Sequence, residues 1–296
     1  MSLFKKKKIA LSTPHGHFRD VCRNFARNRV ALAALIVLTV IVLLAIFADV
    51  IADYNDVALK QNPRDRLQLP SAQHWLGTDN YGRDLFARIV HGARYSLLFG
   101  IGCTALSLAI GCVLGAATAY YGGALDSIVM RFLDTVMCIP SLLLALTIVA
   151  VCGSGLKSLT IAITVASVPG FTRMVRSVVL SVVSLDFIEA ARSCGTRDSA
   201  IIFGHILPNA IGPIIVNCMM NIAGIIMTAA GLSYLGMGIK PPAPEWGSML
   251  SEGMQIFRRY PHVALCSGVA IMITALCFNL VGDGLADAID PKRRDR

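Results

Sequence analysis

Six long uncharged runs alternate with charged segments along this chain of 296 residues. A helix rises about 1.5 Å per residue, so roughly 20 apolar residues cross a hydrocarbon layer about 30 Å thick. The pattern therefore predicts an all-α membrane protein with six transmembrane helices. The predicted spans are residues 30–52, 97–119, 135–156, 158–172, 210–239 and 263–282.

Four of these runs depart from a plain apolar helix. In the second, Gly111 and Gly115 form a small-residue step that predicts close approach of another helix. The third carries Pro140 near its start, where we expect a kink. The fourth is short, and we expect it to end with Arg173 and Arg176 near the headgroups, which long basic side chains reach by snorkelling. The fifth exceeds one perpendicular crossing, so we expect it to end in a non-spanning segment.

Basic residues gather on one side of the six spans. Of the 27 Lys and Arg residues, 17 lie in segments on the side of the N-terminus. Since Lys and Arg concentrate in cytoplasmic loops, both termini are predicted to be cytoplasmic. The expected organisation is a cytoplasmic N-terminal segment (1–29), a first transmembrane helix (30–52), a periplasmic or extracellular segment (53–94), a core of five transmembrane helices (95–284) that includes an inner loop (186–208), and a cytoplasmic tail (285–296).

The composition agrees with a membrane protein and argues against several other classes. The chain is 55% hydrophobic and 15% charged, which leaves no room for a sizeable soluble domain. Its net charge of +9 comes from basic residues beside apolar runs, without the interleaved aromatics of a nucleic-acid surface, so no nucleic-acid partner is predicted. The sequence assigns no role to the basic block Lys5–Lys8. The nine cysteines form no C-x-x-C pair, so we expect neither a zinc site nor a disulfide framework.

The inner loop has the punctuation of two short helices. Asp186 is placed to cap the first, with Glu189 three residues later as in a capping box. Gly195 suits the left-handed position that ends a helix. Thr196 is then placed to cap a second helix, which Pro208 and the residue before it are expected to stop. The predicted product is a helix-turn-helix on the cytoplasmic surface.

This loop resembles the EAA loop of ATP-binding-cassette (ABC) importer permeases. The residues that carry the resemblance are Glu189, Ala190, Ala191, Gly195, Leu207 and Pro208. In that family the loop is the coupling helix, which seats in a groove of the ATP-hydrolysing subunit. The usual pattern has Ile where this chain has His205, and here Ile206 follows one place later. The resemblance therefore implies an ATPase-coupling role for residues 186–208, including Asp186.

Other segments resemble the dipeptide, oligopeptide and nickel permease group, and within it the second, C-type permease. They are residues 74–84, 92–96, 241–247 and 279–285, with Asp290 and Pro291 near the end. The outer-face motif within them consists of Leu76, Gly77, Thr78, Asp79, Gly82, Arg83 and Asp84. From the residues alone, Thr78 and Asp79 also fit a turn bonded to its own backbone. That turn is compatible with an outer cap on which a solute-binding protein docks.

The resemblance implies a fold, partners and a location. The fold would be that of type I ABC importer permeases, in a multi-pass protein of the bacterial inner membrane. The expected partners are a homologous second permease, two ABC ATPase subunits, identical or paired, a periplasmic or lipid-anchored solute-binding protein, and membrane lipid. ATP and Mg²⁺ would be bound by the ATPase subunits, with no cofactor or metal in this chain. Relatives move dipeptides, longer peptides, metal chelates and glutathione, and the sequence does not choose among them.

Covalent chemistry is not indicated. Residues 153–158 resemble a phosphate-binding loop, but such a loop needs Gly directly before its Lys and a strand before it. Ser141 and Ser167 lie in predicted spans without a His or Lys placed to activate them, so we expect a non-catalytic subunit. The alternative is a secondary transporter driven by an ion gradient. That class predicts acids near the bilayer midplane, or paired broken helices in an inverted repeat.

Overall fold

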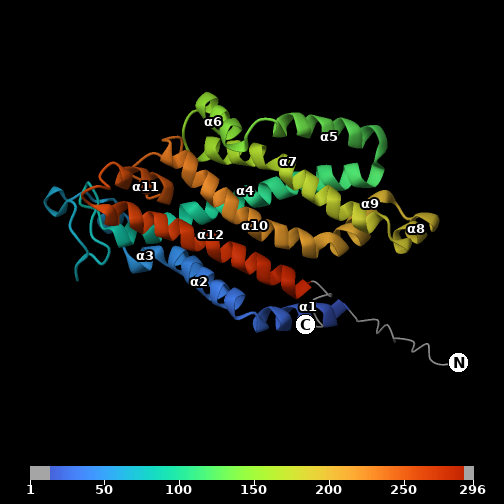
Figure 1. The fold of residues 1–296 in the computed structure, drawn as a ribbon, viewed down its shortest axis with the longest axis horizontal. Helices are drawn as coiled ribbons and strands as arrows, with labels where there is room; N and C mark the ends of the chain where they lie inside the picture. Colours follow the sequence, from blue (N-terminus) through green and yellow to red (C-terminus); the bar gives the residue numbers. More distant parts are fainter. Residues whose placement is uncertain (1–13, 290–296) are drawn as a thin grey trace.

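Long helices run side by side in an elongated bundle (Figure 1). The computed structural model describes residues 14–289, so Lys5–Lys8, Asp290 and Pro291 lie outside the described residues. The α-helices are α1 (Pro14–Arg27), α2 (Arg29–Ile46), α3 (Ala48–Ile51), α4 (Leu85–Tyr121), α5 (Gly123–Met137), α6 (Ser141–Cys152), α7 (Leu156–Val183), α8 (Asp186–Ser193), α9 (Asp198–Ala200), α10 (Leu207–Tyr234), α11 (Trp246–Met254) and α12 (Pro261–Ile289). Single-turn π-helices cover Tyr54–Leu59 and Ile201–Ile206, and a 3₁₀ turn covers Pro63–Asp65.

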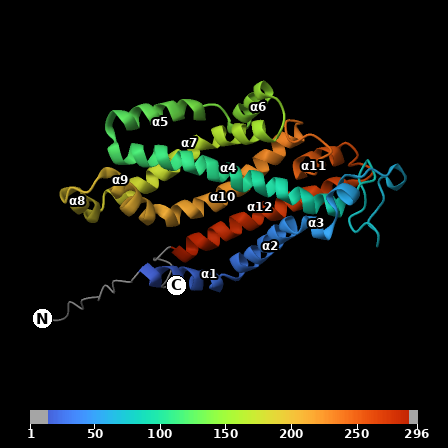
Figure 2. The ribbon, with the colours of Figure 1, turned by 180° about the vertical axis from the view of Figure 1, so that it is seen from behind.

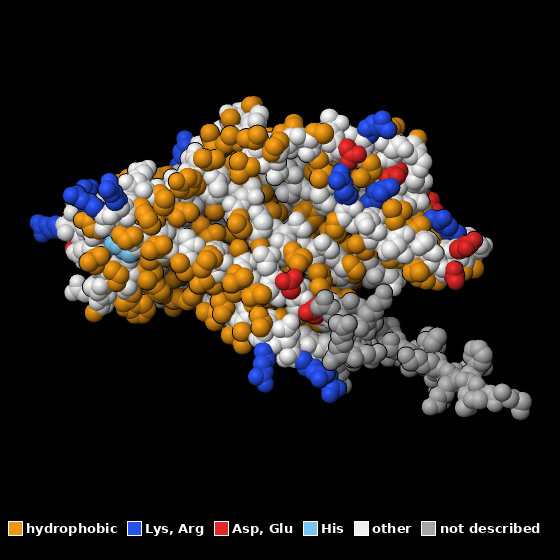
Figure 3. Space-filling view, in the orientation of Figure 1, with side chains coloured by type: hydrophobic (Ala, Val, Ile, Leu, Met, Phe, Trp, Pro, Cys, Tyr) orange, Lys and Arg blue, Asp and Glu red, His pale blue; other side chains and the backbone are white. Residues whose placement is uncertain are grey.

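The all-α class is confirmed, and the spans match the predicted number when the bent pair counts as one. Within residues 14–289, five helices are long and apolar enough to cross a membrane, and α5 with α6 forms a bent pair that supplies a sixth. Hydrophobic side chains cover the middle of the face shown in Figure 3, while most charged side chains lie toward the two ends. This distribution fits a bundle whose middle faces hydrocarbon.

The third predicted span is broken and not merely kinked. α5 ends at Met137, α6 begins at Ser141, and their axes differ by 83°. Pro140 causes the break because it has no amide hydrogen and because the residue before a proline avoids helical geometry. We call α5 and α6 together the broken span.

The helix that carries the fourth predicted span is longer than the span itself, which we expect to end at Arg173 and Arg176. α7 passes both residues and continues to Val183. Arg173 pairs with Asp134 of α5 at 2.5 Å, and both Arg176 Nε and Nη2 donate to the Asp126 carboxylate at 2.6 Å. Since each arginine has an acidic partner from the broken span, the helix carries both charges without ending there.

The close helix approach predicted at Gly111 and Gly115 is confirmed. α4 and α7 pack along much of their length, as the reverse view in Figure 2 shows. A Cβ added at Gly111 would lie 2.8 Å from Phe171 Cβ, and one at Gly115 would lie 2.6 Å from the Thr172 carbonyl oxygen. Only glycine lets the two helices come this close.

Candidate functional site

The inner-loop residues (186–208) and the outer-face motif (76–84) lie at opposite ends of the bundle. α8 and α9 lie at one end, the end at which α12 finishes, while the loop 54–84 and α11 lie at the other (Figure 1). We call residues 186–200 the inner foot, and the loop 54–84 together with α11 the outer cap. A cavity lined by the broken span lies between these ends.

The inner foot forms its first helix without the predicted capping box. α8 begins at Asp186 itself, its N-cap is Leu185, and no side chain among the described residues caps it. Asp186 and Glu189 both lie in the first turn, where acidic side chains interact favourably with the positive end of the helix dipole. The two acids therefore support the start of α8 through their charge and not by capping.

Gly195 lies where the sequence predicts a left-handed residue. Its φ is +72°, and the amide of Thr196 donates to the carbonyl of Ala191 at 3.2 Å. The amide of Gly195 donates to the carbonyl of Arg192 at 2.9 Å. These bonds close the end of α8 in a defined turn.

The second half of the inner loop differs from the prediction. Thr196 does not cap a helix, because α9 begins at Asp198 with Arg197 as its N-cap. Pro208 does not stop the helix either: it lies in the first turn of α10, directly after the π-helix Ile201–Ile206. A π turn holds one extra residue and leaves altered carbonyl positions, which accommodates a proline that cannot donate.

The foot is fixed to the bundle by apolar anchors. Ile188 of the foot is fully buried in one apolar cluster with Ile201 and Ile206 of the π turn that follows and with residues of α4, α7 and α10. The Tyr120 hydroxyl at the end of α4 donates to Asp198 at 2.7 Å, and the Arg192 guanidinium lies 4.5 Å from the centre of the Tyr120 ring. The foot is thus a stiff attachment to two long helices.

The outward surface of this end is exposed and mixed in character. The Glu189 side chain is exposed and makes no hydrogen bond or ion pair within residues 14–289. Phe187 is 43% exposed, and Phe203, on the π turn, is 67% exposed. Ala190 is exposed and Ala191 is half-buried, so small side chains lie between these groups. Large apolar groups and a free carboxylate on one stiff surface are typical of an interface for another protein.

The outer cap, by contrast, contains a buried network of charges. Arg83 Nε donates to Asp79 Oδ2 at 2.6 Å, and Arg83 Nη2 donates to Glu252 Oε2 of α11 at 3.1 Å. Arg88 Nε lies 3.4 Å from Asp79 Oδ2. Arg83 and Arg88 are both 1% exposed. Two acids face two bases here, so the cluster is neutral overall and joins the loop to α4 and α11.

Other residues of the outer-face motif set the path of the backbone. Asp84 caps α4 by accepting from the Ala87 amide at 2.8 Å, and its other oxygen lies 2.8 Å from His74 Nδ1. Gly77 and Gly82 have φ of +81° and +73°, and a Cβ at either would overlap backbone oxygens of the neighbouring loop. Leu76 packs against the apolar core, and Thr78 is fully buried and bonds to Asp65 and Gln68. Most of the motif thus lies beneath the cap surface.

Glu245 and Trp246 attach α11 to the bundle. The Glu245 carboxylate caps α11 by accepting from the amides of Gly247 and Ser248, both at 2.8 Å. Burial raises the pKa of this carboxyl above its ordinary value of 4.5, against the effect of those hydrogen bonds. Trp246 donates through Nε1 to the carbonyl of Ile89 at 3.0 Å, and a Cβ at Gly92 would strike its ring.

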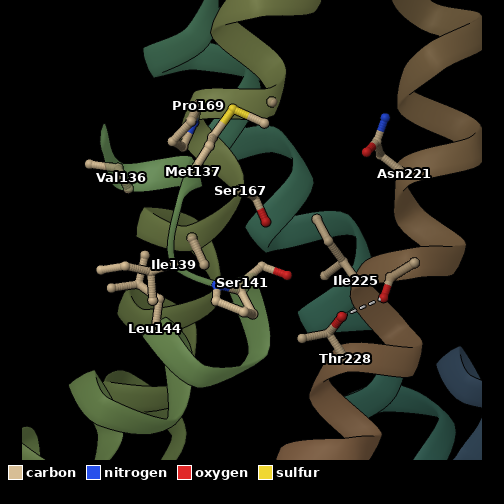
Figure 4. A pocket seen from close by; sticks show the side chains of 14 residues that line it. Val136, Met137, Ile139, Ser141, Leu144, Ser167, Pro169, Asn221, Ile225 and Thr228 are labelled. Carbon is tan, nitrogen blue, oxygen red and sulfur yellow. Dashed lines mark hydrogen bonds between the residues drawn. The ribbon is translucent and has the colours of Figure 1, made fainter. Parts of the chain in front are cut away.

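A cavity of about 390 Å³ opens where the span breaks. Ser141 at the start of α6 and Ser167 on α7 line one wall, and Asn221 and Thr228 of α10 line the opposite wall (Figure 4). The figure shows both serine hydroxyls pointing toward α10. Among the described residues, no ionisable side chain lines the cavity. It can therefore bind by hydrogen bonding but holds no acid or base for catalysis.

The sequence showed some of these residues without showing that they meet. The sequence places Ser141 and Ser167 in predicted spans as unactivated serines and gives no reason to group them with Asn221 and Thr228. The available signal is the Asn217 and Asn221 pair, two amides one turn apart in a long apolar run. Polar side chains inside a predicted span point to a pathway or a helix contact, and only the fold decides between the two.

Two families match this chain. Residues 107–295 match the family described as binding-protein-dependent transport system inner membrane component, and residues 17–70 match the N-terminal transmembrane domain of oligopeptide transport permease C. Together the two matches cover the outer cap loop up to residue 70, the cavity and the inner foot.

Curated relatives match over nearly the whole chain. A dipeptide transport system permease protein from Alkalihalophilus pseudofirmus is 43% identical over 277 residues, which cover 94% of this chain and 90% of that protein. A glutathione transport system permease protein from Pectobacterium atrosepticum is 43% identical over 276 residues, which cover 93% of this chain and 91% of that protein. Each match therefore covers more than nine-tenths of this chain.

A solved structure shares the fold. A chain of the MetNI methionine ABC transporter, in an inward-facing conformation, superposes with a TM-score of 0.58 at 19% identity, covering 69% of this chain and 96% of that chain. At this identity the likeness concerns the fold alone. The length of the family match and the identity to curated relatives carry the assignment: this chain belongs to the inner membrane components of binding-protein-dependent transport systems, the membrane-spanning permease subunits of ABC importers.

Proposed function

We propose that this permease carries peptides, or similarly small polar solutes, across the bacterial inner membrane, driven by ATP hydrolysis in partner subunits. The observation that carries the proposal is the inner foot: a stiff helical turn, anchored by Ile188, that presents an unpaired Glu189 beside exposed Phe187. A rigid element of this kind transmits the closure of an ATPase to the helices attached to it, where a flexible loop would absorb the movement.

Members of the family work with ATPase subunits and with substrate-binding proteins. For this chain we propose the full set as one homologous permease, two ABC ATPase subunits that bind ATP and Mg²⁺, and a solute-binding protein that docks on the outer cap. In this arrangement the inner foot is cytoplasmic, as are both termini. The excess of Lys and Arg on that side supports this orientation.

The substrate class follows from the relatives. The two relatives above, each 43% identical, are named for dipeptide and for glutathione, which is itself a short peptide. Both solutes are polar and small and carry amide groups. We therefore assign this permease to the transport of short peptides.

The coupling role is tested by changing the foot in the assembled transporter. Glu189→Lys reverses the charge of the exposed surface, and Gly195→Pro removes the φ of +72° and an amide that donates to Arg192. Both variants should insert in the membrane yet lose solute-stimulated ATP hydrolysis. Lys157→Glu, a charge reversal at an exposed residue outside both the foot and the outer cap, is the control and should keep it. Stimulation at the wild-type level in both foot variants would remove the coupling role.

The ion-gradient alternative finds little support in the fold. Residues 14–289 contain one bent helix pair and not the two that an inverted repeat supplies. The two ion pairs between α5 and α7 are internally neutral and lie outside the cavity lining. Uptake that survives complete ATP depletion, with a chain purified free of ATPase subunits, would restore that alternative.

A further inference from the structure

The cavity at the broken span carries an inference about substrate contact, which rests on the proposed transport function. We propose that this cavity is a solute-binding subsite that selects neutral hydrogen-bonding groups, the backbone amides of a passing peptide, and does not select the charge of its side chains. Four polar side chains from three elements converge on it: Ser141, Ser167, Asn221 and Thr228.

The depth of the cavity fits a point on a transport path. Its lining on α7 runs from Ala166 to Gly170, at least ten residues from either end of that helix. At about 1.5 Å per residue, this places the cavity roughly 15 Å or more from both ends of α7. Backbone that departs from a helix is tolerated at such depth where it is buried in protein or lines a polar cavity, and the broken span does so here.

The polar groups retain capacity to bind a ligand. Neither the Ser141 nor the Ser167 hydroxyl makes a hydrogen bond within the described residues, so each can donate and accept. Asn221 Nδ2 donates to the Asn217 carbonyl at 2.7 Å, which leaves Asn221 Oδ1 free to accept. The Thr228 hydroxyl donates to the Gly224 carbonyl at 2.9 Å and keeps its acceptor lone pairs. A peptide unit offers one donor and one acceptor, which this set can meet.

Charge is excluded from the cavity lining. The ion pair of Arg173 with Asp134 lies outside this lining, three residues beyond Gly170 on α7 and two residues before Val136 on α5. Each charge of the pair is already compensated by the other. A charged group held at this depth would pay a desolvation cost without a counter-charge, whereas an amide needs only hydrogen bonds. The subsite therefore contacts what all short peptides share.

The size of the cavity also fits, and two glycines keep it open. A volume of about 390 Å³ lies within the range of about 300–1,000 Å³ typical of small-molecule sites. Gly170 and Gly224 line it, and a Cβ added at either would meet no atom within 4 Å. Close packing does not require glycine at these positions, so a larger side chain there would enter the cavity without displacing the helices.

The first test compares two asparagines one turn apart on α10. Both donate to the carbonyl four residues earlier, but Asn217 is half-buried and only Asn221 is exposed and lines the cavity. The assembled wild-type transporter and its Asn221→Ala and Asn217→Ala variants are placed in proteoliposomes with the binding protein. ATP-dependent uptake of Ala-Ala, Lys-Lys, Glu-Glu and glutathione is measured at saturating loaded binding protein. Losing one hydrogen bond should lower uptake in Asn221→Ala about three- to tenfold.

The proposal requires that this loss be alike for every peptide that the wild type carries and absent in Asn217→Ala. ATP hydrolysis stimulated by the binding protein should persist in both variants, because the foot is intact. Equal uptake by the two variants, or a loss confined to one charge class, would overturn the subsite. If the wild type carries none of the four peptides, the proposed substrate class fails and the subsite fails with it. The two failures are therefore distinguishable.

A second test fills the cavity. Gly224→Leu places a branched side chain in the open space, and Gly102→Leu on α4 is the matched control because its added Cβ also meets nothing within 4 Å and lies outside the cavity. We expect Gly224→Leu to lower uptake of Ala-Ala by about tenfold or more, with unchanged amounts of assembled transporter, since small-to-large changes are harmful only where the space is used. Uptake that is equal in both leucine variants would place the passage elsewhere.

Discussion

The outer cap and the inner foot are built in opposite ways. In the cap, motif residues such as Thr78, Asp79 and Arg83 are buried and bonded to one another, to other residues of the cap loop or to α11. In the foot, Ile188 is the one buried residue of α8, and Glu189 faces outward without a partner among the described residues. The cap pairs most of its charges internally, whereas the foot leaves its surface for another molecule to complete.

The two motifs therefore have different physical roles: the cap motif stabilises the fold, and the foot motif presents a surface for binding. In the cap, the glycines and charges determine how the chain folds, and their loss should act first on stability. In the foot, a few apolar anchors provide stability while the exposed residues remain free to bind, and their loss should act first on coupling. This assignment would be wrong if cap substitutions impaired coupling without loss of stability, or if substitutions of exposed foot residues impaired stability first.

The largest effect is expected from the buried charges of the cap. Arg83→Met removes the nearer basic partner of both Asp79 and Glu252 and leaves Arg88 as the one base facing the two acids. The network then carries an excess negative charge in a buried place, which should cost about 3–5 kcal/mol. Thermal unfolding of the purified complex, together with the yield of folded protein, measures this. Arg66→Met, an exposed arginine in the same loop, is the control and should change stability by less than about 0.5 kcal/mol. A small effect at Arg83 would mean that the cap does not depend on this network.

A smaller, local effect is expected from the anchor of the foot. Ile188→Ala leaves a cavity against α7 and should weaken docking of the foot by about 2–4 kcal/mol. Hydrogen exchange at residues 186–195 should become faster while the cap is unchanged. Phe187→Ala is the matched control on the exposed face: it should leave exchange unchanged but weaken binding of the ATPase subunit. Faster exchange in Phe187→Ala alone would reverse the assigned roles of the two residues.

Features that depend on neighbouring residues could be predicted from the sequence, whereas contacts between distant residues could not. Apolar periodicity, Gly195 and the Gly111 and Gly115 step are local signals, so the helices, the left-handed turn and the tight packing were all predicted. The pairing of Arg176 with Asp126 joins residues 50 positions apart, and the cavity joins four elements, so neither follows from local pattern. The sequence does not predict the π turn before Pro208, because a proline that ends a helix and a proline that follows a π turn look alike in a sequence.

The smallest effect concerns the pH response of the cap. Because burial holds the pKa of Glu245 above 4.5, the folded protein binds this proton more tightly than the unfolded chain does. Its contribution to stability is therefore fully present below pH 4.5 and is lost as the pH rises from 4.5 through the raised folded-state pKa. Glu245→Gln keeps the shape and lacks the titration, so it isolates the effect of this carboxyl from that of all other acids.

Thermal unfolding of the wild type and of Glu245→Gln should be followed from pH 5 to pH 8 in the same detergent. As the pH falls, the wild type should gain on the order of 1 kcal/mol relative to the variant. The hydrogen bonds from Gly247 and Ser248 oppose this gain, because they favour the charged form. If those bonds outweighed burial, the wild type would instead lose stability relative to Glu245→Gln as the pH falls. The sign of this difference thus shows whether the cap is closed tightly enough for the effect of burial on Glu245 to outweigh that of its hydrogen bonds.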